Sequence, residues 1–340
     1  MRKEDGGTGR TVIVTGGNQG LGYQAAKNVA AADEGWNVVV AGRNEEKVEE
    51  AVGRMRVESG SSRVEGMVLD LASLRSVRSF AEAFAAREDL PSLGALVCNA
   101  GLQVVSGTTY TKDGVETTFG VNHLGHYLLV NLLVGEMVSP ARIVFVSSGT
   151  HDPKQRTGMP APRYPGSKAL AWPERHPDPD AGDEGAGVVG RRRYTTSKLS
   201  NLYATYELAR RLTGSGITSN AFDPGLMPGT GLARDWGPAA RFASDRVLPL
   251  LQPVFDMFRM NINTVETSGR ALARLVTDPE LEDVSGRYFE GEREIPSSEL
   301  SYDRENAMEL WETSAELVGL GAEETVLRTG DQAPGRTPKM

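Results

Sequence analysis

The sequence predicts a doubly wound α/β fold with a mostly parallel sheet, on three observations. Short apolar runs rich in Val, Ile and Leu alternate with helical stretches from Thr11 to Val146. Few of these runs alternate polar with apolar residues, which is typical of strands buried on both faces. The first run ends in a glycine cluster that leads directly into a helix. Repeated β-α-β units with right-handed crossovers place helices on both faces of such a sheet.

The elements follow one another in a regular order. We expect strands at 11–15, 38–41, 66–70, 95–98, 142–146 and 218–222. We expect helices from the glycine cluster to 32, then at 45–57, 74–87, 118–138, 194–212, 265–276 and 305–317, with an amphipathic, proline-interrupted segment at 241–260.

Residues 151–193 interrupt this rhythm, because they are rich in proline and show little periodicity. A loop of this length is usually functional or disordered. We therefore divide the chain into a flexible start, one domain with an insertion and a lid, and a partly disordered tail. These parts are 1–10, 11–320 (insertion 151–193, lid about 226–262) and 321–340.

Composition limits the classes of function. The 340 residues carry a formal net charge of −8, which argues against nucleic acid as the main partner. The single cysteine, Cys98, fits a reducing compartment, and the charged start lacks an apolar leader, so we expect a cytoplasmic protein. No apolar run approaches the roughly 20 residues of a membrane span. The four histidines lack a third ligand at a suitable spacing, so we expect no metal site and a structural role for His123 and His126.

The glycine cluster at the first strand–helix junction predicts a nucleotide site. Glycines allow a sharp turn and close approach of the backbone to a diphosphate, whose charge is met by free N–H groups and the helix dipole. An ordinary tight turn is the alternative interpretation. The cofactor-binding candidates here are Gly16, Asn18, Gln19, Gly20, Leu21 and Gly22.

The end of the second strand favours NADP(H) over NAD(H). A base at this position suits a 2′-phosphate, whereas an acid suits a free ribose hydroxyl. Arg43 follows the strand, and Lys47 lies one helical turn later on the same face. The alternative interpretation is that Arg43 and Lys47 are ordinary charged residues at the solvent-exposed start of a helix.

Together these features resemble the short-chain dehydrogenase/reductase family over about 11–320. The matching motifs are 15–22, Asp70-Leu71, Asn99-Ala100-Gly101, Asn122, residues 146–148, the Tyr194 to Lys198 segment and Pro224-Gly225. The resemblance implies a Rossmann-like domain in which Asp70 and Leu71 border the adenine. It also implies that Asn99, Ala100 and Gly101 line the cofactor, and that Pro224, Gly225, Leu226 and Thr230 contact its carboxamide or phosphates.

Tyr194 and Lys198 are four residues apart, so a helix places them on one face. A nearby ammonium and an oxidised nicotinamide favour the phenolate, so we expect a lowered tyrosine pKa and proton exchange with a carbonyl or alcohol. By the resemblance, Lys198 also holds the nicotinamide ribose, Ser148 orients the substrate oxygen, and Asn122 supports a proton-relay water.

A second tyrosine has the same spacing. Tyr164 precedes Lys168 by four residues, but Pro165 and Gly166 make a poor helix start. We therefore favour Tyr194.

Two branches of the family resemble this chain most: retinol-dehydrogenase-like enzymes and light-dependent protochlorophyllide reductases. The second branch carries a cysteine directly after the Pro-Gly pair, where this chain has Leu226. We expect an oxidoreductase acting on a bulky apolar ketone or alcohol, because the lid segment is strongly apolar. The alternatives are a protochlorophyllide-reductase-like C=C reductase and a catalytically silent NADP-binding sensor or scaffold. The resemblance further implies a homodimer or homotetramer, unless the insertion blocks the usual interface.

Overall fold

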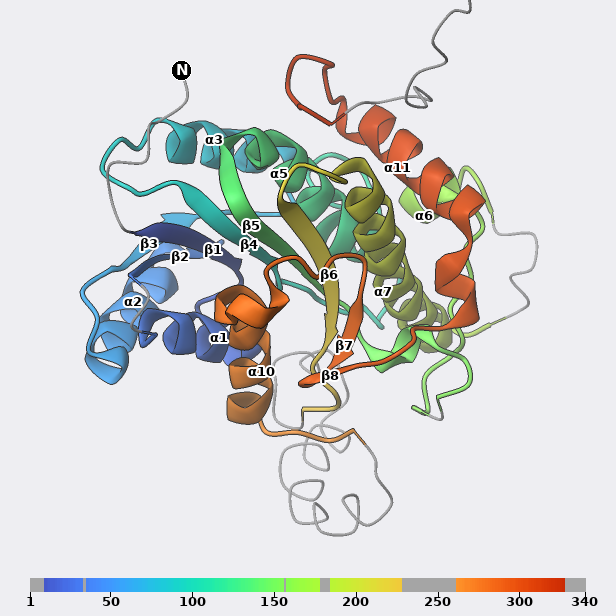
Figure 1. Cartoon of the computed structure of the whole chain (residues 1–340). Helices are drawn as coiled ribbons and strands as arrows, with labels where there is room; N and C mark the ends of the chain where they lie inside the picture. The colour runs from blue at the N-terminus through green and yellow to red at the C-terminus, as the bar shows by residue number, and fades with distance from the viewer. Residues whose placement is uncertain (1–8, 33–34, 156, 178–183, 228–260, 328–340) are drawn as a thin grey trace, which may run out of the picture.

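A single eight-stranded sheet lies between two helical layers in the computed structural model (Figure 1). The structure describes residues 9–32, 35–155, 157–177, 184–227 and 261–327. The strands are β1 (Arg10–Thr15), β2 (Trp36–Gly42), β3 (Val64–Val68), β4 (Leu93–Cys98), β5 (Met137–Val146), β6 (Ile217–Asp223), β7 (Tyr288–Glu290) and β8 (Arg293–Glu294).

The strand order, β3-β2-β1-β4-β5-β6-β7-β8, confirms the doubly wound parallel prediction. All neighbouring strands are parallel except β7 and β8. The order reverses between β1 and β4, and in such sheets ligands bind outside the carboxyl ends of the strands at this point. The short strands β7 and β8 were missed by the sequence analysis.

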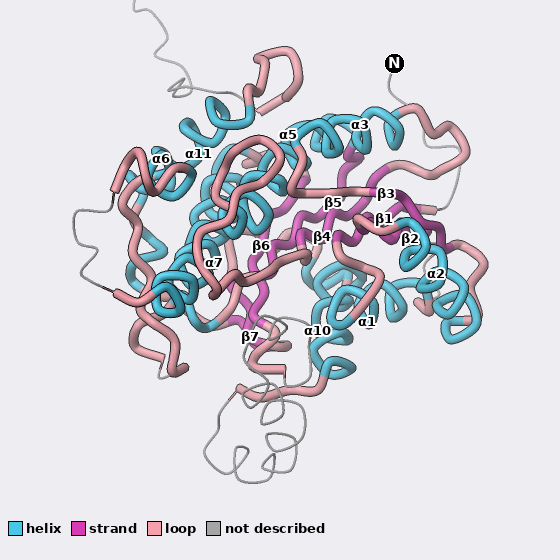
Figure 2. Tube along the Cα trace, turned by 180° about the vertical axis from the view of Figure 1, so that it is seen from behind, coloured by secondary structure: helices cyan, strands magenta, loops and turns pink. Residues whose placement is uncertain are grey.

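Helices cover both faces of the sheet (Figure 2). One face carries α1 (Gly20–Ala30), α2 (Glu45–Ser59) and α10 (Val265–Thr277), whereas the other carries α3 (Leu74–Ala85), α5 (Gly125–Leu133) and α7 (Ala186–Arg211). Alternate residues of β1 enter separate cores, with Val12 and Val14 on the first face and Ile13 on the second. This double burial explains the uninterrupted apolar strands.

The helix that carries Tyr194 begins eight residues earlier than expected, at Ala186. This first part of the helix contains two glycines, Gly187 and Gly190. A Cβ on Gly190 would clash with the backbone of Val104 and lie 2.8 Å from the Cα of Val105, so this glycine permits close packing. Residues 186–193 of the expected insertion therefore belong to α7, and the segment before them contains a short helix, α6 (Ser167–Ala171).

The expected helix 118–138 is a composite. It consists of α4 (Thr117–Phe119), a π-turn (Gly120–Leu124), α5 and a 3-10 turn (Val134–Glu136), and β5 begins at Met137 rather than at residue 142.

The C-terminal helix α11 (Arg304–Val318) packs across α7, α6 and α5. Residues 321–327 are placed against the same layer, since Glu324 pairs with Arg78 and Leu327 is buried. The other expected ends, 1–8 and 328–340, lie outside the described residues, as does the segment 241–260. Within the described part, no helix is long and apolar enough to cross a membrane.

Candidate active site

The predicted motifs meet at the carboxyl edge of the sheet. The strands β1, β4, β5 and β6 end at Thr15, Cys98, Val146 and Asp223, and the glycine turn, Asn99, Ser147 and Pro224 follow them directly. Because neighbouring strands are parallel, these four strand ends share one edge. Segments more than 200 residues apart in sequence thus form one site.

The glycine turn fits a diphosphate. Gly16 and Gly20 have φ of 63° and 55°, values that favour glycine. A Cβ on Gly22 would clash with Asn99 Nδ2 and lie 2.6 Å from the Gly16 carbonyl oxygen. Helix α1 has no side-chain N-cap and no acidic residue in its first turn, so its N-terminal N–H groups are suited to an anion.

Thr15 and Asn99 join this turn to β4. The Thr15 hydroxyl oxygen accepts hydrogen bonds from the N–H groups of Asn99 and Ala100, at 2.9 and 3.0 Å. The Asn99 amide donates to the Thr15 carbonyl at 2.8 Å. Asn99 thus joins the end of β4 to the end of β1, a structural contact that the sequence analysis did not specify.

The two basic candidates lie beside the second strand. Arg43 directly follows β2, Lys47 lies in the first turn of α2, and both side chains are exposed. Neither forms an ion pair with another described residue. Asp70 follows β3 and pairs with Lys112 at 2.9 Å, while Leu71 is buried.

Asn122 lies within the π-turn and is buried. Its side chain accepts from the Leu102 N–H at 2.8 Å and donates to the Leu102 carbonyl and to Ser197 Oγ, each at 2.9 Å. The backbone carbonyl of Asn122 accepts a hydrogen bond from His126 Nδ1 at 3.2 Å. Because Nδ1 carries the proton of the neutral ring, His126 Nε2 can accept a hydrogen bond from the Thr15 hydroxyl at 2.8 Å. Burial lowers the pKa of His126 to about 4, so this neutral histidine is a structural link, as expected.

The loop carrying Ser148 is held by a buried histidine. His151 Nε2 accepts from the Ser298 N–H at 3.0 Å, so Nδ1 carries the proton and donates to the Ser148 carbonyl at 2.6 Å. Burial lowers the His151 pKa, which favours this neutral form. His151 is fully buried and supports the serine loop from behind.

Tyr194 and Lys198 lie on one face of α7, both almost fully buried. Lys198 Nζ lies 5.5 Å from the Tyr194 ring centroid and donates to the Val146 carbonyl at 3.0 Å. Burial, followed by the charge of Asp223, raises the Tyr194 pKa, whereas Ser148 lowers it. The direction is opposite to the one expected from sequence, because desolvation disfavours the phenolate. Burial lowers the Lys198 pKa to about 8.

Asp223, which the sequence analysis did not select, is buried at this edge. It accepts from the Gly225 N–H at 2.9 Å and from the Tyr288 hydroxyl at 3.1 Å. Burial raises its pKa. An acid directly before the Pro-Gly pair was the available sequence signal.

The Pro-Gly loop is fixed by residues that follow the lid. The Pro224 carbonyl accepts from Ser268 Oγ at 2.7 Å and from Asn263 Nδ2 at 3.0 Å. Gly225 has φ of 75°, and a Cβ there would approach Asn261 to 2.5 Å. Leu226 is 49% exposed. Thr230 and the lid residues 228–260 lie outside the described residues.

The second tyrosine belongs to the scaffold. The Tyr164 hydroxyl bonds to Ser167 Oγ at 2.8 Å and donates to Glu309 of α11. Lys168 pairs with Glu316 at 3.3 Å instead of approaching Tyr164. Burial raises the Tyr164 pKa.

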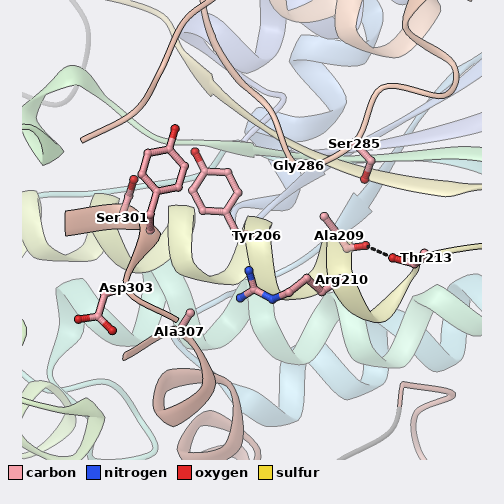
Figure 3. Close-up of a pocket in the computed structure, with 10 residues that line it drawn as sticks. Tyr206, Ala209, Arg210, Thr213, Ser285, Gly286, Ser301, Asp303 and Ala307 are labelled. Atoms are coloured by element: carbon pink, nitrogen blue, oxygen red, sulfur yellow. Dashed lines mark hydrogen bonds between the residues drawn. The ribbon is translucent and has the colours of Figure 1, made fainter. Parts of the chain in front are cut away.

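An open hollow of about 400 Å³ lies between α7 and the segment 301–303 (Figure 3). Tyr206 and Arg210 line it from the second half of α7, roughly 18 Å along the helix from Tyr194. It is therefore separate from the carboxyl edge. No group of three metal-ligating side chains occurs among the residues that the structure describes.

The fold and the glycine turn define a Rossmann-like nucleotide-binding protein. The family model for short chain dehydrogenases matches residues 10–171. The chain is 37% identical to human retinol dehydrogenase 13 over 92% of its length and 86% of that protein, and 37% identical to human WW domain-containing oxidoreductase over 92% and 68%. A crystal structure of a Mycobacterium paratuberculosis protein is 28% identical, with a TM-score of 0.64 over 91% of this chain and 93% of that one. The chain belongs to the short-chain dehydrogenase/reductase family, on its retinol-dehydrogenase-like branch.

Proposed function

We propose that the protein is an NADPH-dependent oxidoreductase that reversibly interconverts a carbonyl and an alcohol on a bulky apolar substrate. The observation that carries the proposal is the arrangement of Tyr194 and Lys198 on one buried helix face, beside Ser148 and at the edge where the glycine turn lies.

The cofactor supplies the hydride when bound. The glycine turn and the α1 N-terminus would hold its diphosphate, because this helix start has no side-chain cap and no acidic residue in its first turn. Arg43 and Lys47 would hold the 2′-phosphate, and Asp70 and Leu71 would border the adenine. Asn99 to Gly101 and residues 224–226, with Thr230, would surround the nicotinamide half.

Tyr194 donates its proton to the substrate oxygen during reduction, and the Ser148 hydroxyl orients that oxygen. A raised pKa keeps Tyr194 protonated at neutral pH, which suits a proton donor. The Lys198 ammonium stabilises the phenolate left behind and binds the ribose. We assign the support of a proton-relay water to Asn122, which is buried beside Ser197 and Leu102.

The substrate class rests on two supports. Retinol dehydrogenase 13 is named for a bulky apolar alcohol. Leu226 is an exposed apolar side chain next to the Pro-Gly loop. Leu226 also replaces the cysteine of the light-dependent branch, so we favour ordinary hydride transfer. We place the enzyme in the cytoplasm on its single, buried cysteine.

Turnover measurements test the proposal. NADPH oxidation with a panel of long-chain aldehydes, ketones and quinones should detect a substrate, and Tyr194→Phe should lower kcat by roughly 10²–10⁴-fold. Tyr164→Phe is the matched control, since it removes the other hydroxyl of the same sequence spacing, and its kcat should stay near that of the wild type. Wild-type kcat in Tyr194→Phe would refute the proton donor, and tight NADPH binding without turnover would favour the sensor alternative.

A further inference from the structure

We propose that Asp223 is a positioning residue of this site, whose carboxylate sustains the charge of Lys198 and thereby sets the alkaline limit of carbonyl reduction. The inference rests on the proposed function, with Tyr194 as proton donor. Asp223 acts through Lys198 and Tyr194 and has no assigned contact with substrate.

The hydrogen-bond partners of Asp223 favour an ionised carboxylate, whereas its burial opposes ionisation. The side chain is 1% exposed, and the groups bonded to it are donors. Oδ1 accepts from the Gly225 N–H at 2.9 Å, while Oδ2 accepts from the Tyr288 hydroxyl at 3.1 Å and from the Asn261 amide at 3.4 Å. Hydrogen bonds from donors alone favour the charged form of a carboxyl group.

The strand register places this carboxylate beside the catalytic candidates. Phe222 of β6 is opposite Val146 of β5. The next residues along the chain, Asp223 and Ser147, therefore lie side by side. A Cβ on Gly149 would lie 3.0 Å from Asp223 Oδ2, which puts the carboxylate directly against the serine loop. Lys198 Nζ bonds to the Val146 carbonyl at 3.0 Å, one residue from that loop. The negative and positive groups therefore share one buried strand end.

The charge of Asp223 raises the pKa of both neighbouring groups, Lys198 and Tyr194. Burial lowers the pKa of Lys198 to about 8, and Asp223 opposes that shift. Asp223 also raises the pKa of Tyr194, after burial. Burial raises the pKa of Asp223 and is the largest influence on it; the hydrogen bonds from the Gly225 N–H and the Tyr288 hydroxyl lower this pKa, and Glu290 of β7 raises it. His126 is neutral because burial lowers its pKa to about 4, and the charge of Lys198 also lowers this pKa.

The direction in which the pH profile should shift follows from the protonation states of Tyr194 and Lys198 that are active in reduction. Reduction requires a protonated Tyr194 and a charged Lys198, and the Asp223 carboxylate raises both pKa values. Without that charge both groups lose their protons at lower pH. The upper limb of the pH profile of reduction should therefore move to lower pH in Asp223→Asn.

Lysine titration by NMR tests the electrostatic link without turnover. The protein is labelled with ¹³C at lysine Cε, and the Lys198 signal is assigned by its loss in Lys198→Arg. In Asp223→Asn we expect this signal to titrate about one pH unit lower than in the wild type, as for the loss of a nearby opposite charge. Tyr288→Phe removes a hydrogen bond from the same side chain but keeps the carboxyl group, so its Lys198 signal should titrate closer to that of the wild type than the signal of Asp223→Asn does.

An unchanged Lys198 titration in Asp223→Asn overturns the inference, whatever the activity. If that variant does not fold, Asp223→Ser removes the same charge and carries the same test. The companion measurement is the pH dependence of kcat for reduction, and an upper limb that stays in place also overturns the inference. Tyr194→Phe separately decides the proposed function, so the two failures are distinguishable.

Discussion

Tyr194 and Tyr164 show that surroundings, more than sequence spacing, determine what a tyrosine can do. Each precedes a lysine by four residues. Tyr194 lies on a 26-residue helix that brings Lys198 within 5.5 Å of its ring. The Tyr164 hydroxyl is occupied by Glu309 and Ser167, and its lysine pairs elsewhere. Tyr164 therefore anchors the insertion to α11.

At the residue scale, we expect Arg43→Ala to weaken NADPH binding much more than NADH binding. A hydrogen bond to a charged group contributes about 1.5–3 kcal/mol, so the Kd for NADPH should rise roughly tenfold or more. Isothermal titration with each cofactor measures this. Arg63→Ala removes an equally exposed arginine at the amino end of β3 and should leave both Kd values unchanged. An equal loss of NADPH and NADH affinity in Arg43→Ala would contradict the 2′-phosphate assignment.

At the scale of elements, the long buried strands and the motifs that follow them were predictable from local pattern. Apolar runs and glycine turns are local signals, so β1 to β6 and the edge of the site follow from the sequence. The three-residue β7 carries too little pattern to be detected. Asp223 accepts a hydrogen bond from Tyr288 of that strand, 65 residues away, so its buried surroundings could be found only in the tertiary structure. The early start of α7 includes Gly190, whose lack of a side chain permits close packing against Val104 and Val105, and this reason for a glycine is visible only in the tertiary structure.

The glycine turn provides an element-scale prediction. Gly22→Ala should destabilise the fold by roughly 1–3 kcal/mol and weaken cofactor binding, because its methyl group would meet Asn99 and the Gly16 carbonyl. Gly53→Ala is the control, since it lies inside α2 with no atom within 4 Å of the added Cβ. It should stabilise the protein by about 0.5–1 kcal/mol. Thermal unfolding and cofactor titration measure both effects, and equal behaviour of the two variants would contradict a constrained turn.

At the scale of the whole molecule, the C-terminal helix closes the layer that carries α5 and α7. Helix α11 packs on α7, whose residues 194–208 are all buried, so an assembly through α7 would have to form around α11. The expected homodimer or homotetramer stays a prediction, which sedimentation of the full chain can test.

Buried histidines should make the whole fold sensitive to acid. Burial lowers the pKa of His123 to about 3 and of His126 to about 4, and it also lowers that of His151. The unfolded chain binds these protons below about pH 6.5, before the folded chain does. Each neutral histidine therefore contributes fully to the free energy of unfolding above that pH. As the pH falls below it, this free energy decreases by about 1.4 kcal/mol per pH unit for each histidine.

Urea unfolding at several pH values between 7.5 and 5 measures this loss. His126→Gln should reduce the slope of stability against pH, whereas His176→Gln, at an exposed position, should leave it unchanged. A slope that is the same in both variants would show that His126 does not contribute.

Deuterium transfer tests the central claim, hydride delivery by NADPH with Tyr194 as the proton donor, most directly. The protein is incubated with a carbonyl substrate and NADPH that carries deuterium at the reactive C4 position, and the alcohol is analysed by mass spectrometry. We predict one deuterium on the carbinol carbon with the wild type and with Tyr164→Phe, and a rate lower by roughly 10²–10⁴-fold with Tyr194→Phe. Deuterated alcohol formed by Tyr194→Phe at the wild-type rate, or alcohol without deuterium from the wild type, would contradict the account.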